Sequence, residues 1–312
     1  MTVDEKKTTS FAIVGSGAVG CYYGARLVQG GCDVHFLMRS DFDHVQKNGM
    51  QISSCAGDFI LPADQLQVYK NVSAMPEVDW VIVTLKTTEN RLFADLVGPL
   101  LKPDSKILTL QNGLGNEQQL ADMFGKDRIL GGMAFTCINR LSPGVIDHSA
   151  HGYIKLGMFD AGLEKSPARF VSDIFNRCNV PCDVLTDLNY GRWEKLLWNI
   201  PFNGLSTVLD QTTDLLLANP EGEKLVRQIM AEVLHCARAN GANLEDELIQ
   251  KNINRTLEMG AYRTSMHVDR QNGRELEIEA ILGCPMRAGM EKGIANPQMQ
   301  MLYQLACMVA DK

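Results

Sequence analysis

The chain has 312 residues, of which 45% are hydrophobic and 21% charged, and its formal net charge is −7. This length and composition predict about two globular domains. The acidic balance argues against a nucleic-acid-binding protein, which needs a basic face. Apolar runs are far too short to span a bilayer, and the charged N-terminus lacks the apolar stretch of a signal peptide. We therefore expect a cytoplasmic protein with neither a membrane nor a nucleic-acid partner.

Cysteine and histidine spacing bears on metal binding and redox state. Nine cysteines are scattered without a CxxC pair, and the six histidines form no metal-ligand pattern. Cys178 and Cys182, the nearest pair, lack a second pair or a nearby histidine. This spacing favours neither a disulfide framework nor a zinc site. We expect reduced, mostly buried thiols and no bound metal.

The first forty residues predict a strand, a glycine-rich turn, a helix and a second strand. The apolar run at 11–14 stops at a glycine, which is typical of a buried parallel strand. Residues 22–28 suit a helix that ends at Gly30 and Gly31, and DVHFLM at 33–38 suits the next strand. The turn between strand and helix reads GSGAVG, which matches the G-x-G-x-x-G pattern of dinucleotide-binding proteins.

Each glycine of this turn has a steric role in that pattern. Gly15 permits the tight turn, Gly17 lets the backbone approach a pyrophosphate, and Gly20 lets the helix pack closely on the strand. Free N–H groups at the start of the helix attract the phosphates. The predicted cofactor-binding turn is Gly15, Ser16, Gly17, Ala18, Val19 and Gly20.

The end of the second strand predicts which dinucleotide binds. NAD-binding proteins usually place Asp or Glu about 20 residues after the turn, where it holds the ribose 2′-OH. This chain has Arg39 there, and a guanidinium suits the 2′-phosphate of NADP(H), with Ser40 as an added hydroxyl donor. The alternatives are that Arg39 is a solvated surface residue, or that Asp41 holds the ribose. We expect NADP(H).

Two further buried strands are expected after the first βαβ unit, and Lys86 and Asn112 follow them. Ligands bind at the carboxyl ends of parallel strands, so both side chains are candidates for contact with cofactor and substrate. Alternatively, Lys86 is an exposed lysine and Asn112 begins a turn. The two strands are 80–85 and 106–110; the hairpin stretches 129–138, 144–148 and 153–158 and a last strand at 181–185 complete the sheet.

After Thr186 the pattern becomes helical, with apolar residues at helix spacing in 225–239 and 276–290. We therefore predict an α/β fold. A Rossmann-type, doubly wound sheet domain at 1–187 precedes an all-helical domain at 188–312, with a ligand cleft between them.

The segment RWEKLLWNIPFNGL carries the most informative polar pattern of the helical half. Lys195, Asn199 and Asn203 are spaced four apart and share one helix face, among apolar neighbours. Buried polar groups of this kind need partners, which are either a bound polar substrate or an internal hydrogen-bond network. Pro201 should kink or loosen this helix.

Lys195 suits a specific chemistry. Hydride addition to a ketone puts negative charge on the carbonyl oxygen, and a positioned ammonium stabilises that charge and delivers the proton. Desolvation would lower its pKa towards neutrality. In a second cluster of polar residues, Ser265 can donate to a carboxylate, and Glu277 and Glu279 are expected just inside a helix after Gly273. For Asp269 and Glu279 we expect surface roles, and for His267 a solvent or packing role.

Taken together, these motifs resemble the ketopantoate reductase (2-dehydropantoate 2-reductase) family. They appear in family order from residue 11 to about 290, nearly the whole chain. The shared motifs are GSGAVG, a basic residue after the second strand, TLKT, QNGLGN, the WEKLLWNIPFN run, and SMHVD followed by GRELEIE.

The resemblance implies a Rossmann domain and a 6-phosphogluconate-dehydrogenase-like helical domain. It also implies NADPH-dependent reduction of 2-dehydropantoate to (R)-pantoate, in pantothenate and coenzyme A biosynthesis. By resemblance, Lys195 is the general acid, and Glu277 lies close to the nicotinamide and to this lysine. Lys86 and Asn112 match positions near cofactor and substrate. The implied substrate-binding residues are Asn112, Asn199, Asn203 and Ser265.

Two departures leave the particular 2-keto acid open. Some members carry asparagine where this chain has Thr213, and a polar amide where it has Tyr262. A D-2-hydroxyacid dehydrogenase on the same scaffold, acting on bulkier keto acids, is therefore the rival. A non-catalytic NADP-sensing protein is the alternative from another class, and it would not need Lys195 together with its amide neighbours. A homodimer is the candidate assembly.

Overall fold

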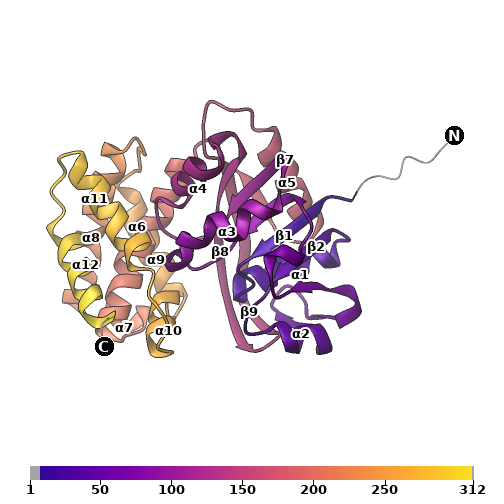
Figure 1. The fold of residues 1–312 in the computed structure, drawn as a ribbon. Helices are drawn as coiled ribbons and strands as arrows, with labels where there is room; N and C mark the ends of the chain where they lie inside the picture. The colour runs from indigo at the N-terminus through magenta and orange to yellow at the C-terminus, as the bar shows by residue number, and fades with distance from the viewer. Residues whose placement is uncertain (1–7, 311–312) are drawn as a thin grey trace. The chain divides into compact units, whose positions relative to one another are not determined.

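The computed structural model describes residues 8–310, and the charged segment at 1–7 lies outside them. The described chain divides into two compact units, one formed by residues up to 111 and 117–188 and the other by 112–116 and the residues from 189 onward. The first unit is built on a β-sheet and the second from helices (Figure 1). Among the described residues, no helix combines the length and apolar character needed to cross a bilayer.

The first unit begins with the predicted strand, turn, helix and strand. These are β1 (Ser10–Val14), α1 (Ala18–Gln29) and β2 (Asp33–Leu37). β1 pairs in parallel with β2 on one side and with β6 (Val78–Val83) on the other. Parallel pairing continues outward to β5 (Gln67–Tyr69) beyond β2, and to β7 (Leu101–Thr109) and β8 (Ile129–Ser142) beyond β6.

The sheet becomes mixed beyond β8. β9 (Val145–Met158) runs antiparallel to β8 with several register shifts, so the two stretches predicted at 144–148 and 153–158 belong to one strand. β3 (Met50–Ser54) and β10 (Cys182–Val184) pair in parallel with β9, and β4 (Phe59–Leu61) pairs antiparallel with β3. Within the described residues the order is β4-β3-β9-β8-β7-β6-β1-β2-β5, with β10 beside β9.

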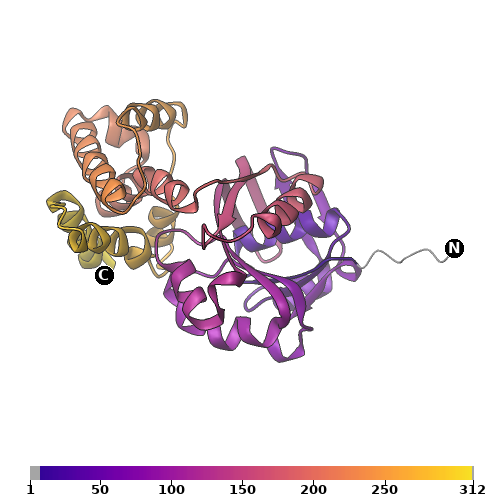
Figure 2. The ribbon, with the colours of Figure 1, turned by 90° about the horizontal axis from the view of Figure 1, so that it is seen from above.

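Side-chain alternation along β1 divides the core of this unit into two layers. Phe11 and Ile13 pack in one cluster with residues of α1 and α5 (Ser166–Arg177). Ala12 and Val14 pack in another with residues of α3 (Phe93–Val97) and α4 (Asn116–Phe124). Helices therefore cover both faces of the sheet, as expected of a doubly wound fold (Figure 2). The remaining helix of this unit, α2 (Phe42–Asn48), follows β2.

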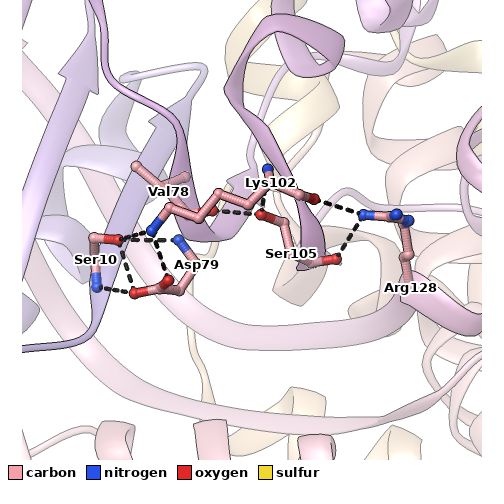
Figure 3. A network of polar contacts seen from close by, with 6 residues as sticks. All are labelled: Ser10, Val78, Asp79, Lys102, Ser105 and Arg128. Carbon is pink, nitrogen blue, oxygen red and sulfur yellow. Dashed lines mark hydrogen bonds and ion pairs between the residues drawn. The ribbon is translucent and has the colours of Figure 1, made fainter. Parts of the chain in front are cut away.

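A polar network joins the beginnings of the strands β1, β6 and β7 (Figure 3). Lys102 Nζ lies 2.7 Å from Asp79 Oδ1, and Asp79 Oδ2 accepts from the backbone N–H and the hydroxyl of Ser10. Ser105 donates to the Val78 carbonyl, and Arg128 Nη1 donates to the carbonyls of Lys102 and Ser105. This network connects the N-terminal ends of these central strands, at the end of the sheet opposite to the glycine turn.

The second unit consists of helices around one apolar core, which includes Trp193, Leu197, Ile229 and Leu302. Its longest helix, α6 (Leu188–Leu209), continues through Pro201, where we expected a kink or loosening. A proline inside a helix costs about 3 kcal/mol, whereas each fully buried large side chain stabilises by about 1.5–3 kcal/mol. The further helices are α7 (Thr213–Ala218), α8 (Pro220–Ala239), α9 (Glu247–Glu258), α10 (Ser265–Gln271), the π-helical turn η6 (Glu279–Gly283), α11 (Cys284–Glu291) and α12 (Pro297–Ala310).

Candidate active site

The glycine turn has the steric properties that its sequence predicts. Gly15 has φ +101°, and a Cβ there would lie 2.4 Å from the backbone nitrogen of Leu85. A Cβ at Gly20 would lie 2.6 Å from the Gly15 carbonyl oxygen. A Cβ at Gly17 would meet nothing within 4 Å, and no side chain caps the N-terminus of α1. The turn thus leaves open backbone, and no described side chain caps the first N–H groups of α1, a geometry that fits the pyrophosphate of a dinucleotide.

The residues after β2 differ in how far the fold already uses them. Arg39 is exposed, with 82% of its side chain accessible, and lies 3.7 Å from Glu89 in a loose ion pair. Asp41 is only 2% exposed, and its carboxylate accepts from Arg140 Nη1 at 2.7 Å and from Gly144 N–H at 3.3 Å. The fold thus uses both carboxylate oxygens of Asp41, whereas the Arg39 guanidinium is largely exposed; the alternative in which Asp41 holds a ribose hydroxyl stays a prediction.

Within the helical unit, Lys195 of α6 meets Asn112 from the loop after β7. Lys195 Nζ donates to Asn112 Oδ1 at 2.9 Å across 83 positions of sequence. Burial and, to a lesser degree, the neighbouring Arg192 cation lower the pKa of the Lys195 ammonium to about 7. The buried Glu277 carboxylate opposes this shift. The pair is therefore an amine poised near neutral pH and oriented by an amide oxygen.

The loop at 112–116 is held against the π-helical turn η6. Leu114 N–H donates to the Ala280 carbonyl at 2.8 Å, and Gly113, with φ +86°, lies so close that a Cβ would be 2.3 Å from that oxygen. In a π-helical turn the Ala280 carbonyl would accept from residue 285, which is Pro285 and has no N–H. The carbonyl is thereby available to the loop, which holds Asn112 beside Lys195.

The predicted amide residues of α6 differ in their partners. Asn203 Oδ1 accepts from Ser265 Oγ at 3.3 Å and from the Met266 N–H at 3.2 Å, so Asn203 is part of an internal network. Asn199 is 5% exposed, and within residues 8–310 its amide makes no hydrogen bond to protein. A nearly buried amide without a protein partner is a group that a polar ligand can satisfy.

Comparison with known proteins shows the family to which this chain belongs. Residues 11–161 match the family model described as ketopantoate reductase PanE/ApbA, and residues 187–310 match that of its C-terminal part. A 2-dehydropantoate 2-reductase from Nostoc sp. is 42% identical over 297 residues, 94% of this chain and 92% of that protein. The chain belongs to the ketopantoate reductase family. It is accordingly an NADP-dependent oxidoreductase.

Solved structures agree with this family assignment. The 2-dehydropantoate 2-reductase from Geobacter metallireducens is 43% identical with a TM-score of 0.93, over 96% of this chain and 99% of that one. A D-mandelate dehydrogenase in complex with NADH and anilino(oxo)acetate has a TM-score of 0.89 at 23% identity, over 97% of this chain and 98% of that one. At that identity the likeness shows a shared fold only.

Other predicted positions of this chain are placed differently from expectation. Lys86 lies three residues beyond the end of β6 and directly before the 3-10 turn η3 (Thr87–Leu92), so it does not end the strand itself. Glu277 was expected inside a helix but precedes it, because the helical stretch begins at Ile278. Glu277 is buried all the same.

The charged residues for which we expected surface roles divide. Glu279 is exposed and paired with Arg287 and Tyr303, as expected. Asp269 is buried, which corrects our expectation, and it lies 3.6 Å from Arg274 Nη1. His267 is buried against Asp210 at 2.7 Å, a packing role.

Sequence reasoning missed Arg192, although the signal was present. Arg192 precedes Lys195 by three residues, which places both on one face of α6. Residues 8–310 contain no group of three His, Cys, Asp or Glu side chains that could hold a metal ion. Cys21, Cys178, Cys182 and Cys236 are buried, Cys55 is exposed, and the other cysteines are half-buried.

Proposed function

We propose that this ketopantoate reductase family member reduces 2-dehydropantoate to (R)-pantoate with NADPH, and that Lys195 donates the proton. The observation that carries the proposal is the Lys195 amine, whose pKa is lowered to about 7 while Asn112 Oδ1 accepts one of its hydrogens. An acid with a pKa near the working pH transfers protons efficiently in both directions.

Bound NADPH supplies the hydride, and the residues of this chain handle the charge that results. Hydride addition leaves an alkoxide on the former carbonyl carbon. The Lys195 ammonium stabilises that oxyanion and then protonates it, which leaves a neutral amine. Glu277, which raises the pKa of Lys195, keeps enough of the ammonium form for this step.

Substrate binding is assigned to the polar groups beside Lys195 in the helical unit. The Asn199 amide is nearly buried and makes no hydrogen bond to the residues that the structure describes, so it offers donors to the substrate carboxylate or hydroxyl. Asn203 Nδ2 and the Ser265 hydroxyl extend this polar surface, since Ser265 Oγ lies 3.3 Å from Asn203 Oδ1. A hydroxylated keto acid matches such a set of donors better than an apolar one.

Cofactor binding is assigned to the glycine turn and its neighbours. We infer that Gly15 to Gly20 cradle the pyrophosphate and that Arg39 contacts the 2′-phosphate. Lys86 and Asn112 are proposed to contribute near the nicotinamide, together with Glu277. The turn geometry and the exposed guanidinium support these assignments.

The test of the proposal is a substrate panel with the purified full-length chain and NADPH. We expect kcat/KM for 2-dehydropantoate to exceed those for phenylpyruvate and benzoylformate by at least about tenfold, the size of one well-matched polar contact. A preference for either aromatic keto acid would instead favour a D-2-hydroxyacid dehydrogenase. That rival is kept because a D-mandelate dehydrogenase shares the fold and because Tyr262 faces the Trp198 ring at 6.2 Å.

We further propose a cytoplasmic homodimer. A dimeric ketopantoate reductase from Staphylococcus aureus has the same fold, which supports the dimer. The free cysteines of the described residues favour a reducing compartment. Light scattering on the purified chain should give twice the monomer mass, and a single-chain mass at assay concentration would refute the dimer.

A further inference from the structure

Two segments far apart in the sequence meet beside the end of β2. Arg140 belongs to β8, and its Nη1 atom donates to Asp41 Oδ1 at 2.7 Å and to Ser40 Oγ at 3.1 Å. Ser40 Oγ in turn lies 2.7 Å from Asp41 Oδ1. Gly144, in the turn between β8 and β9, adds its N–H to Asp41 Oδ2. Hydrogen bonds therefore connect the turn end of the β8–β9 hairpin to Ser40 and Asp41, the two residues that follow Arg39.

This cluster lies next to the glycine turn. The Cys21 thiol in the first turns of α1 contacts the Ser16 carbonyl at 3.3 Å. Burial raises the pKa of this thiol to about 12, with Asp41 adding to the shift and Arg140 opposing it. Because the charges of Asp41 and Arg140 both act on Cys21, the Arg140–Asp41 pair lies close to α1, the helix that follows the glycine turn. In dinucleotide-binding folds the ribose 2′-position lies between that helix and the end of the second strand.

Arg140 retains donors that the fold does not use. A guanidinium carries five N–H groups, and the hydrogen bonds that Arg140 makes to described residues leave from Nη1 alone. Its side chain is 34% exposed, whereas Asp41 is buried. Asp41 therefore holds one edge of the guanidinium in a defined orientation, and the other donors remain accessible to a ligand.

The charge of a 2′-phosphate can be neutralised by more than one cation. A 2′-phosphate carries a charge of about −1.5 to −2 at neutral pH and accepts several hydrogen bonds at once. Arg39 is largely exposed and only loosely paired with Glu89, so by itself it would provide positive charge to the phosphate but little fixed orientation. A guanidinium already fixed by a buried carboxylate loses less side-chain entropy when it binds a phosphate.

We propose that Arg140 is a second determinant of NADP(H) specificity, binding the 2′-phosphate together with Arg39. This inference rests on the use of NADP(H) by the chain and not on the identity of the keto acid. Arg39 would supply the mobile cation, and Arg140 the oriented one.

The test compares two ligands that differ only in the 2′-phosphate, 2′,5′-ADP and 5′-AMP, by isothermal titration calorimetry on the full-length chain. Arg140→Ala should weaken 2′,5′-ADP binding about tenfold to a hundredfold and change 5′-AMP binding less than about twofold. Retained 5′-AMP binding also shows that the variant is folded. Arg169→Ala, at an exposed arginine of α5, is the matched control and should bind both ligands normally.

Arg140→Lys separates recognition from a purely structural ion pair. Lysine can still pair with Asp41 but lacks the second edge of donors, so 2′,5′-ADP binding should weaken severalfold. Unchanged 2′,5′-ADP binding in both Arg140 variants would overturn the inference, as would equal losses for the two ligands. A protein that binds 2′,5′-ADP through Arg140 yet does not turn over 2-dehydropantoate would uphold this inference and refute the proposed function.

Discussion

Two lysines of this chain show how differently a fold can treat the same side chain. Lys102, at the start of β7, lies 2.7 Å from Asp79 Oδ1, and the same carboxylate accepts two hydrogen bonds from Ser10 (Figure 3). Lys195, on α6, has an uncharged amide oxygen as its close partner and a cation, Arg192, among its neighbours. The first ammonium is partly exposed beside a carboxylate, while the second is desolvated and feels both the Arg192 cation and the Glu277 carboxylate.

The shifted pKa values reflect this difference. Partial burial tends to raise the pKa of the Asp79 carboxyl, but hydrogen bonds from Lys102 and Ser10 outweigh it and hold the pKa below its usual value. For Lys195, burial and Arg192 act together to lower the pKa, against Glu277. A charge pair near the surface stabilises the fold, whereas a desolvated ammonium gives up its proton more easily. The comparison predicts that Lys195 serves chemistry and Lys102 serves stability.

The sharpest test of this division is Lys195→Ala. Removal of both the proton donor and the oxyanion-stabilising charge should lower kcat/KM for keto-acid reduction about a thousandfold. NADPH affinity, measured by fluorescence titration, should stay within about threefold. Lys195→Arg should be nearly as slow, because a guanidinium does not release its proton. Turnover at the wild-type rate in Lys195→Ala would refute the assigned role and favour a non-catalytic NADP-binding protein.

The next effect tests how Asn112 is held beside Lys195. Gly113→Ala places a methyl group 2.3 Å from the Ala280 oxygen and should displace the loop. Since a misplacement of about 1 Å can cost about a hundredfold in rate, kcat/KM should fall tenfold to a hundredfold.

Gly115→Ala is the matched control for this variant. Gly115 has φ +95°, close to the +86° of Gly113, but a Cβ there would meet nothing nearer than Cys284 Sγ at 3.9 Å. Both variants should lose about 1–3 kcal/mol of stability from backbone strain, measured by denaturant unfolding. If Gly115→Ala slows catalysis as much as Gly113→Ala, contact with η6 is not what positions Asn112.

A smaller and graded effect is expected from pH. The Lys195 ammonium is the proton donor and its pKa is about 7, so kcat/KM for reduction should fall about tenfold per pH unit above that value. Oxidation of the hydroxy acid should show the opposite trend, because it requires the neutral amine. Arg192→Gln removes a neighbouring cation and should move the decline in reduction to higher pH. A decline that stays at the same pH in Arg192→Gln would exclude Lys195 as the titrating group.

Local steric and periodic signals explain what sequence alone could predict. The strand–turn–helix–strand start follows from sterics within some thirty residues, and the structure confirms its elements. The shared face of Lys195, Asn199 and Asn203 follows from helical periodicity. The same periodicity contains Arg192, which we missed. The roles of these residues remain predictions.

Contacts between distant segments account for what the sequence could not predict. Asn112 follows a strand but belongs to the helical unit, because Leu114 N–H of its loop donates to the Ala280 carbonyl. Arg140 meets Asp41 across 99 positions, through a hairpin whose length no local pattern reveals. The strands β3, β4 and β5 were missed, since they have only three to five residues each. Tertiary pairing rather than intrinsic propensity decides such short strands.

The smallest expected effect concerns Lys102 and completes the comparison of the two lysines. Lys102→Met keeps the aliphatic stem and removes the charge. Lys102 and Asp79 are each about a third exposed, so solvent screening limits the loss of unfolding free energy to about 1 kcal/mol at neutral pH, with kcat/KM unchanged. The folded-state pKa of Asp79 is below its unfolded value, so this contribution is present above about pH 4 and is lost as the pH falls through the folded pKa. Denaturant unfolding at neutral and at acid pH should therefore show the stability difference between Lys102→Met and wild type shrinking in acid. A difference that persists in acid would mean that Lys102 contributes by packing of its stem, and the contrast with Lys195 would then rest on burial rather than on charge pairing.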